Sequence, residues 1–262
     1  MGKYDSSRTR VVPVFDALME RDSSGNSWLP RLLQLGSLSS GRLEGLVPGP
    51  LVAEQRKWWG RNERHLNPPR DLLRWLVENL DEPASQSCWG SGDTKTKRKL
   101  LVAGHKEAKE EALRLLESEP KRSAWYVLEG QSRPDACLET ANLVLIIEGK
   151  RTEAKPTTTT TWMPQRSQML RHMDAAWEVR KEKKVLGMMI VEGSAETGSL
   201  EPDSYWSRQA EDQIKEEMLT KSLPHRTPKE RAQIAEGFLE ATTWQRVCSE
   251  LRLPWPPATD ID

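Results

Sequence analysis

The stretch Leu143-Val-Leu-Ile-Ile-Glu-Gly-Lys150 decides the fold of this chain. An unbroken apolar run that ends in a glutamate, a glycine and a lysine is typical of a strand whose last residues reach the edge of a sheet. The segment Arg133-Pro-Asp-Ala-Cys-Leu138 precedes it. The two segments are close enough to form a hairpin through residues 139–142. We therefore expect an antiparallel strand pair here.

The register of this hairpin decides which side chains meet. With a two-residue turn, Asp135 lies opposite Ile146. Because alternate residues of a strand share a face, Asp135, Glu148 and Lys150 then project from one face. A turn that is one residue longer would place Asp135 on the other face. The first register predicts two carboxylates and an ammonium within reach of one another.

Two neighbouring carboxylates and a lysine suit one particular chemistry. The carboxylates repel each other, and burial would raise a pKa unless a cation is present. Mg²⁺ takes one or two carboxylates together with water and substrate phosphate. The lysine supplies positive charge where negative charge develops in a transition state. It can also orient or help to deprotonate a water bound to the cation. These residues predict hydrolysis of a phosphodiester.

Pro134-Asp135, the apolar strand and Glu148-x-Lys150 resemble the signature of the PD-(D/E)xK nucleases. The resemblance covers residues 94–192. It implies a restriction-endonuclease-like core of mixed α/β class, in which a helix, three antiparallel strands, a helix and a fourth strand form a central mixed four-stranded sheet flanked by helices. It also implies that Asp135 and Glu148 hold Mg²⁺, which Mn²⁺ could replace. Gly149 would offer its carbonyl to the cation, and Lys150 would be the catalytic lysine.

The resemblance extends to two helices beside the signature. Many members carry a glutamate on the first helix that reaches the metals, and Glu111 and Glu107 are the candidates here. An exonuclease-like branch carries a glutamine on the following helix, which Gln168 matches, with Gln165 one turn earlier on the same face. That branch has a tyrosine four residues after the glutamine. This chain has His172 there, which we expect on the helix surface.

Periodicity predicts the elements around the hairpin. We expect helices at Val14–Arg21, at Leu29–Leu38, from Pro69 onward, at Lys95–Glu119, at Pro164–Lys184, and two or three within Pro202–Leu251. We expect strands at Trp125–Glu129, Ala136–Leu138, Leu143–Glu148 and Val185–Val191. On this basis we divide the chain into a mostly helical, tryptophan-rich accessory region (residues 1–92) and a nuclease-like domain with C-terminal helices (residues 93–262).

The composition excludes several classes of protein. The 262 residues include 39 basic and 39 acidic side chains, so the formal net charge is zero. This balance excludes a histone-like coat of positive charge but not a local basic patch. The apolar runs are far shorter than the roughly 18 residues of a membrane span. Three cysteines without a C-x-x-C pair favour neither a disulfide framework nor a zinc site. We expect a cytoplasmic protein without membrane contact.

Two functions compete on these observations. The first is a Mg²⁺-dependent nuclease that acts on nucleic acid, with DNA as the expected substrate. The alternative is a non-catalytic nucleic-acid- or protein-binding module on the same fold, with residues 1–92 as the surface for a protein partner. Four basic residues follow the proposed site, and they either neutralise phosphates or line a solvated face: Arg151, Lys155, Arg166 and Arg171.

Overall fold

The computed structural model describes residues 6–36, 43, 45–52, 56–58, 63–83, 85–118, 124–151, 153 and 162–257. In chain order the elements are η1 (Ser7–Val11), α1 (Val12–Arg21), α2 (Leu29–Leu35), β1 (Arg56–Trp58), α3 (Arg70–Glu78), η4 (Gln86–Trp89), α4 (Gly92–Val102), α5 (Lys106–Glu117), β2 (Ala136–Glu139), β3 (Leu143–Gly149), α6 (Gln168–Val179), β4 (Lys184–Val191), α7 (Tyr205–Gln213), α8 (Glu216–Ser222), α9 (Pro228–Glu236), β5 (Thr242–Thr243) and α10 (Trp244–Glu250). Within these ranges none of the helices has the length and apolar character that a bilayer crossing requires.

The strands form one mixed sheet in the order β1-β2-β3-β4-β5. The pairs β1–β2 and β2–β3 are antiparallel, whereas β3–β4 and β4–β5 are parallel. The parallel connection from β3 to β4 runs through α6, as a parallel pair requires. The mixed α/β class is as predicted. The four strands β1 to β4 carry the sheet, and the two-residue strand β5 extends it.

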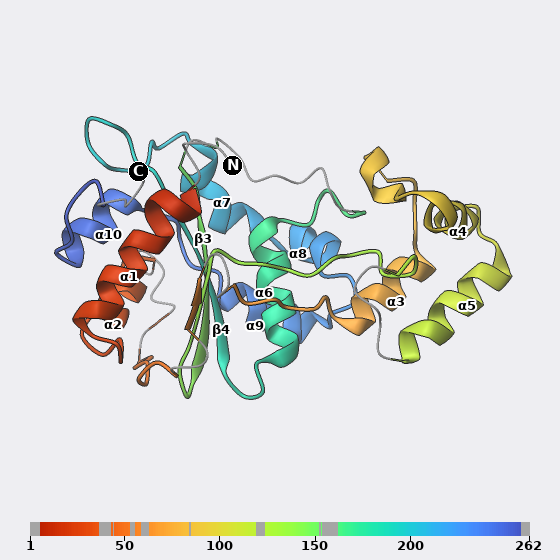
Figure 1. The fold of residues 1–262 in the computed structure, drawn as a ribbon, viewed down its shortest axis with the longest axis horizontal. Coiled ribbons are helices and arrows are strands. Elements are labelled where there is room, and N and C mark those ends of the chain that lie inside the picture. The colour runs from red at the N-terminus through yellow and green to blue at the C-terminus, as the bar shows by residue number, and fades with distance from the viewer. Residues whose placement is uncertain are drawn as a thin grey trace.

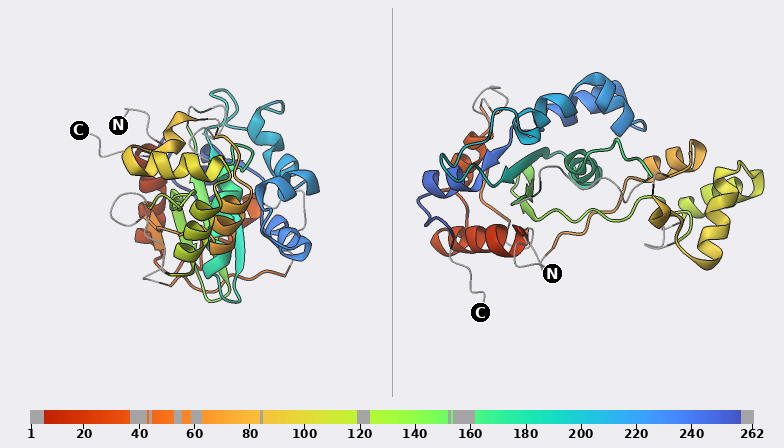
Figure 2. Two further views of the ribbon diagram at one scale, coloured as in Figure 1. Left: turned by 90° about the vertical axis from the view of Figure 1, so that its right-hand side faces the viewer. Right: turned by 90° about the horizontal axis from the view of Figure 1, so that it is seen from above.

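Helices cover both faces of this sheet, so the central part of the molecule has three layers. Figure 1 shows α1, α2 and α10 on one side of β3 and β4, and α6 to α9 on the other. The helices α3, α4 and α5 form a separate group beyond α6, which we call the helical lobe. Both Figure 1 and the right-hand view of Figure 2 place the helical lobe at one end of the molecule and α1 near the other.

Burial on both faces explains the apolar run in β3. Leu145 and Ile147 belong to the core on the α1 side, whereas Val144 and Ile146 belong to the core on the α6 side. Every residue of β3 is buried, as expected for a strand with helices on both faces. On β4, the missing side chain of Gly187 lets α6 approach, because a Cβ there would lie 2.4 Å from Met173 Sδ.

The helix expected at Lys95–Glu119 is wrong as a single element. The chain forms α4 and α5 instead, separated by residues 103–105. Gly104 has a φ of 76°, a left-handed conformation that a glycine adopts without steric cost. Both helices pack in the helical lobe around Leu101, Ala112 and Leu116 rather than on the sheet. Glu119 lies outside the described residues.

The strand expected at Trp125–Glu129 is also wrong. These residues form turns and irregular backbone, and the apolar side chains from Trp125 to Leu128 fill the core of the helical lobe. The guanidinium of Arg98 donates hydrogen bonds to the carbonyls of Trp125 and Val127 at 2.9 and 3.1 Å. An arginine therefore satisfies backbone groups that a neighbouring strand would otherwise bind. In the sheet, β1 stands beside β2.

Most of the other elements agree with the periodicity, but the C-terminal part forms four helices, α7 to α10, where two or three are expected. Strands β2, β3 and β4 are where the pattern places them, α1 and α3 form as expected, and α9 begins at Pro228. Helix α6 is shorter than expected, and α2 ends at Leu35, with positions 37–38 outside the described residues. The boundary drawn at residues 92–93 does not coincide with a division in the packing. One core joins Phe15 to the sheet, and another joins Leu72 to α5.

Candidate functional site

Asp135 and Glu148 come together where β2 begins and β3 ends. Ala136 pairs with Ile147, and continuing this register places Asp135 opposite Glu148. The register expected from a two-residue turn, with Asp135 opposite Ile146, is therefore wrong, since Cys137 faces Ile146. The shift is two residues, and an even shift preserves the face. The two carboxylates consequently meet, as the hairpin predicts.

Glu148 is a buried carboxylate with donors on two sides. Its Oε1 accepts hydrogen bonds from Lys150 Nζ at 2.8 Å and from Gln168 Nε2 at 2.5 Å. Burial alone would raise the pKa of Glu148, but the neighbouring His172 ring and Lys150 ammonium outweigh it and lower the pKa to about 2. The predicted residues Glu148, Lys150 and Gln168 thus form one cluster, built from β3 and the first turn of α6.

The other oxygen of Glu148 has no hydrogen bond. Glu148 Oε2 and both ring nitrogens of His172 are buried and lack a hydrogen-bond partner within the described residues, although His172 Nε2 lies 3.3 Å from Glu148 Oε2. Gln168 Oε1 is also buried and lacks a hydrogen-bond partner within the described residues. His172 is only 4 % exposed, so the surface position expected for it is wrong. It shares a helix face with Gln168 because four residues make about one turn.

Asp135 is held by a strand on one side and by the N-terminal segment on the other. Its Oδ2 accepts a hydrogen bond from the Gly149 N–H at 2.8 Å, and its Oδ1 accepts one from Ser7 Oγ at 2.7 Å. Burial and the negative charge of Glu148 raise the pKa of Asp135 to about 7, against the lowering effect of those two hydrogen bonds. At neutral pH this carboxyl is poised between its two protonation states.

Sequence reasoning missed the contribution of the N-terminal segment. Ser6 Oγ donates a hydrogen bond to the carbonyl oxygen of Gly149 at 3.0 Å, so adjacent serines touch two of the predicted site residues. No sequence pattern predicts this contact, because serine is common near turns and helix starts. The serines reach the site through the packing of η1 against the end of β3.

The structure does not bring Glu111 to this cluster. Glu111 lies on α5 in the helical lobe, where its carboxylate is 3.1 Å from Lys97 Nζ. Glu107, the other candidate, is exposed on the same helix. In Figures 1 and 2, α5 lies at the far end of the molecule from the end of β3. The expectation assumed that the helix before the β2–β3 hairpin covers the sheet. That helix, α5, packs in the helical lobe instead.

The basic residues after the site divide into separate environments. Arg166 is fully buried and binds Asp174 at 2.7 Å and Glu129 at 3.1 Å, so it is not exposed to a phosphate. Arg151 donates a hydrogen bond to Thr9 Oγ1 at 3.3 Å beside the site. Lys155 lies outside the described residues.

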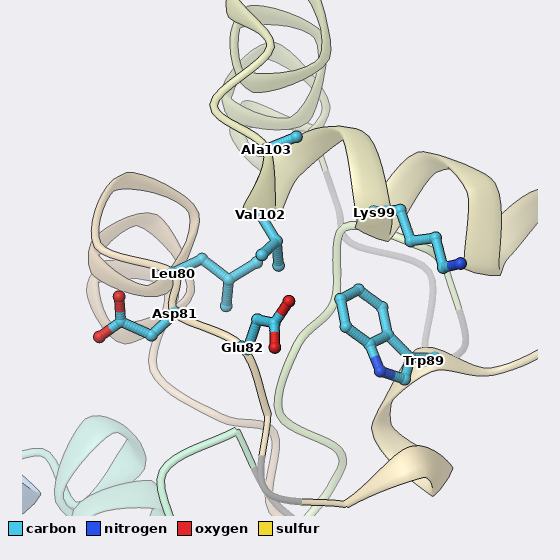
Figure 3. Close-up of a pocket in the computed structure, with 7 residues that line it drawn as sticks. All are labelled: Leu80, Asp81, Glu82, Trp89, Lys99, Val102 and Ala103. Carbon is cyan, nitrogen blue, oxygen red and sulfur yellow. The ribbon is translucent and has the colours of Figure 1, made fainter.

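A cavity of about 580 Å³ lies in the helical lobe rather than at the strand ends. Figure 3 shows it between the residues that follow α3 and the last turns of α4, with the Trp89 ring along one wall. None of its lining residues belongs to the cluster around Glu148. They are Leu80, Asp81, Glu82, Trp89, Lys99, Val102 and Ala103.

Comparisons with known proteins do not assign this chain to a family. No family model matches it, and neither a curated protein sequence nor a solved structure does. The chemistry of the cluster therefore has to be inferred from its own geometry.

That geometry suits a hard divalent cation with few protein ligands. Within the described residues, no group of three or more His, Cys, Asp or Glu side chains is arranged to hold a metal ion. Two carboxylates and a backbone carbonyl are nevertheless a set that Mg²⁺ accepts, because Mg²⁺ keeps several waters and takes oxygen ligands from its substrate. The buried, unpartnered Glu148 Oε2 and the raised pKa of Asp135 are what a cation would relieve. The residues present fit such an ion.

Proposed function

We propose that this chain is a nuclease that depends on a divalent cation and hydrolyses phosphodiester bonds, with DNA as the expected substrate. One observation carries the proposal. The buried Glu148 carboxylate lies between Lys150 and the end of the neighbouring strand, where Asp135 is held. Within the described residues its Oε2 accepts no hydrogen bond, and His172 Nε2 lies 3.3 Å away. Lys150 balances the charge of one carboxylate. The second buried carboxylate, Asp135, is unfavourable in its charged form unless a further cation joins the pair.

The order of the elements supports the proposal. When α2 and the helical lobe are set aside, the order is a helix, three antiparallel strands, a helix and a fourth strand, formed by α1, β1, β2, β3, α6 and β4. This is the order that the resemblance to the PD-(D/E)xK nucleases implies, so we propose a restriction-endonuclease-like core. In this assignment the first helix is α1, and the helical lobe is inserted between β1 and β2.

In this proposal Asp135, Glu148 and the carbonyl of Gly149 hold Mg²⁺, and Mn²⁺ can replace it. The cation supplies Lewis-acid chemistry at the phosphodiester. Gln168 would orient Glu148, because its amide donates to Oε1. Oε2, which accepts no hydrogen bond within the described residues, would be the oxygen that binds the cation. Asp135 is oriented by the Gly149 N–H.

Lys150 serves as a fixed positive charge. Burial alone would lower its pKa, but the Glu148 carboxylate outweighs burial and holds the pKa above its usual range. This charge can stabilise negative charge that develops on the phosphate. We therefore assign Lys150 to charge stabilisation and to assisting the attacking water.

The experiment that tests the proposed function compares linear, circular and single-stranded DNA, and a matching RNA, in Mg²⁺, Mn²⁺ or EDTA. The informative variant is Glu148→Gln, which keeps the size of the side chain and removes its charge. Glu139→Gln is a matched control, since Glu139 also pairs with a lysine, Lys183, at 2.5 Å, but at the other end of β2. We expect cation-dependent cleavage by the wild type and by Glu139→Gln, and none by Glu148→Gln.

Two results would contradict the proposal. Cleavage by Glu148→Gln at the wild-type rate would show that the activity resides elsewhere. A folded wild type that binds nucleic acid equally well in Mg²⁺ and EDTA, and cleaves none of the substrates, would favour the binding module instead.

A further inference from the structure

We propose that Ser6 and Ser7 are positioning residues of the cation site, so that the N-terminal segment forms part of the catalytic centre. This inference rests on the proposed function, since it concerns the same cation. The segment concerned runs from Ser6 to Val11. It includes η1 and packs against the end of β3.

The two serines hold two of the groups that would bind the cation, Asp135 and the carbonyl of Gly149. Ser7 Oγ lies 2.7 Å from Asp135 Oδ1, and Ser6 Oγ lies 3.0 Å from the carbonyl oxygen of Gly149. The same glycine donates its N–H to the other oxygen of Asp135 at 2.8 Å. Asp135, Gly149 and the two serines therefore form one hydrogen-bonded unit. Both serines are only 8 % exposed, so water does not compete freely for these contacts.

Close packing seats the segment at this position. A Cβ on Gly149 would lie 2.8 Å from Val11 Cγ2 and 2.9 Å from the Trp244 ring, so only a glycine lets the segment approach β3 this closely. Arg10 fixes the segment to the neighbouring strand end, because its guanidinium binds both oxygens of Glu192 at 2.8 Å. Val11 is fully buried in the core beside the sheet. These contacts hold the segment in place beside Asp135 and Gly149.

These hydrogen bonds leave lone pairs on the ligand oxygens with which a cation could be bound. A carboxylate has about four lone-pair positions and a carbonyl oxygen has two. A serine hydroxyl occupies one position on Asp135 Oδ1 and one on the Gly149 carbonyl oxygen. A hydroxyl that donates to a ligand oxygen holds its orientation without occupying the metal. Removing such a partner typically lowers metal affinity about 10- to 100-fold. The serines thereby act on the cation through Asp135 and Gly149.

A purely structural role predicts something different. If the serines only satisfied buried polar groups, their loss would lower stability equally with and without the cation. If they position ligands, their loss would raise the cation concentration needed for half-saturation. The two roles are therefore separated by a cation titration rather than by stability alone.

The experiment measures the thermal unfolding midpoint of the full-length chain during titrations with Mg²⁺ alone and Mn²⁺ alone, since a ligand that binds the native state raises that midpoint. The variants are Ser7→Ala, Ser6→Ala and Ser7→Thr, which retains a hydroxyl. Ser27→Ala is the matched control, because Ser27 Oγ donates to an Asp22 carboxylate oxygen at the same 2.7 Å on an exposed turn. Glu148→Ala tests the proposed function itself.

We expect Ser7→Ala to raise the half-saturating concentration about 10- to 100-fold, and Ser7→Thr and Ser27→Ala to behave like the wild type. Should Ser7→Ala not fold, Ser6→Ala carries the same comparison with the Asp135 contact intact. An unchanged half-saturating concentration in the serine variants would overturn this inference and leave the proposed function standing. A wild type that no cation stabilises, or an unaltered response in Glu148→Ala, would overturn both.

Discussion

Lys150 Nζ lies 2.8 Å from Glu148 Oε1, and the two side chains are only 12 % and 5 % exposed although they stand at the end of a strand. Residues two apart on a strand share a face, so the pair is a direct consequence of the Glu-x-Lys spacing. Charges at a strand end normally reach water. Here three parts of the chain enclose the strand end: the N-terminal segment, α6 and Trp244. The Nε1 of Trp244 donates a hydrogen bond to the Lys150 carbonyl oxygen at 3.2 Å. This burial turns an ordinary ion pair into a candidate catalytic pair.

Lys150→Ala should abolish most of the cleavage. Removing a charge that stabilises a transition state typically lowers the rate about 10²- to 10³-fold. The control is Lys183→Ala, which breaks the pair with Glu139 at the far end of β2 and should cleave like the wild type. The measurement compares the initial rates of DNA cleavage by the two variants and the wild type in Mg²⁺. Equal rates for Lys150→Ala and wild type would disprove the role of Lys150.

Asp135 should make stability fall as the pH rises. Its pKa is about 7 in the folded chain, against an ordinary 3.8, so the native state holds an extra proton between these values. The free energy of unfolding therefore decreases across this interval and levels off above about pH 7. Urea denaturation across the interval, in EDTA, should show this decline in the wild type and a weaker one in Asp135→Asn.

The same titration in saturating Mg²⁺ provides a second comparison. A cation on Asp135 competes with the proton and keeps the carboxylate ionised, so the decline should become shallower. The variant Asp135→Asn should respond little to Mg²⁺. A wild type whose pH profile is identical in Mg²⁺ and EDTA would show that no cation reaches Asp135.

Asp174 should be far more important for stability than an exposed aspartate. It is fully buried and accepts hydrogen bonds from Arg166 at 2.7 Å and Arg226 at 2.8 Å. Asp174→Asn removes the carboxylate that the two guanidiniums share and leaves them Glu129 and Glu178 as their closest remaining carboxylate partners. Losing one partner of a buried ion pair costs about 3–5 kcal/mol of unfolding free energy. The exposed Asp212, paired with Lys215, is the control, and Asp212→Asn should change stability far less than Asp174→Asn. Urea denaturation at neutral pH measures both.

The pH dependence of Asp174 has the opposite sign to that of Asp135. Burial alone would raise the pKa of Asp174, but the Arg166 charge outweighs it and holds the pKa well below its usual range. Its contribution is therefore present above its ordinary pKa of 3.8 and is lost as the pH falls below that value toward the folded pKa. Acid unfolding of Asp174→Asn should accordingly lack part of the wild-type transition. Identical acid transitions would contradict this assignment.

Glu111→Gln should leave cleavage unchanged. The side chain pairs with Lys97 on the surface of the helical lobe, and a partly exposed pair of this kind contributes about 0–1 kcal/mol to stability. Its cleavage rate and its half-saturating Mg²⁺ concentration should equal those of the wild type. A marked loss of activity would mean that the helical lobe closes over the site during the reaction.

Much of the candidate site follows from short-range patterns. The apolar run of β3 and the Glu148-x-Lys150 spacing place the ion pair, and the hairpin brings Asp135 to the same edge. One turn of α6 relates Gln168 to His172. The hairpin register was two residues from the expected one, yet the facing was correct because side chains alternate with a period of two.

Patterns failed where distant segments compete for the same place. Lys95–Glu119 has a helical period, but the period does not tell which core the helix covers. Trp125–Glu129 has the composition of a strand, but the Arg98 guanidinium binds its carbonyls and the helical lobe takes its side chains. Periodicity indicates which residues are buried, not which partner buries them.

The sequence by itself determined the central strands, the helix between β3 and β4, and the grouping of Glu148 with Lys150. Only the tertiary structure decided that β1 completes the antiparallel strands, that Glu111 lies elsewhere, and that Ser7 meets Asp135 across 128 positions of the chain. The reason is physical. Backbone geometry dictates the spacing of neighbouring residues, whereas a contact between distant segments depends on the packing of the whole core around a site such as Gly149, where the absence of a side chain admits Val11.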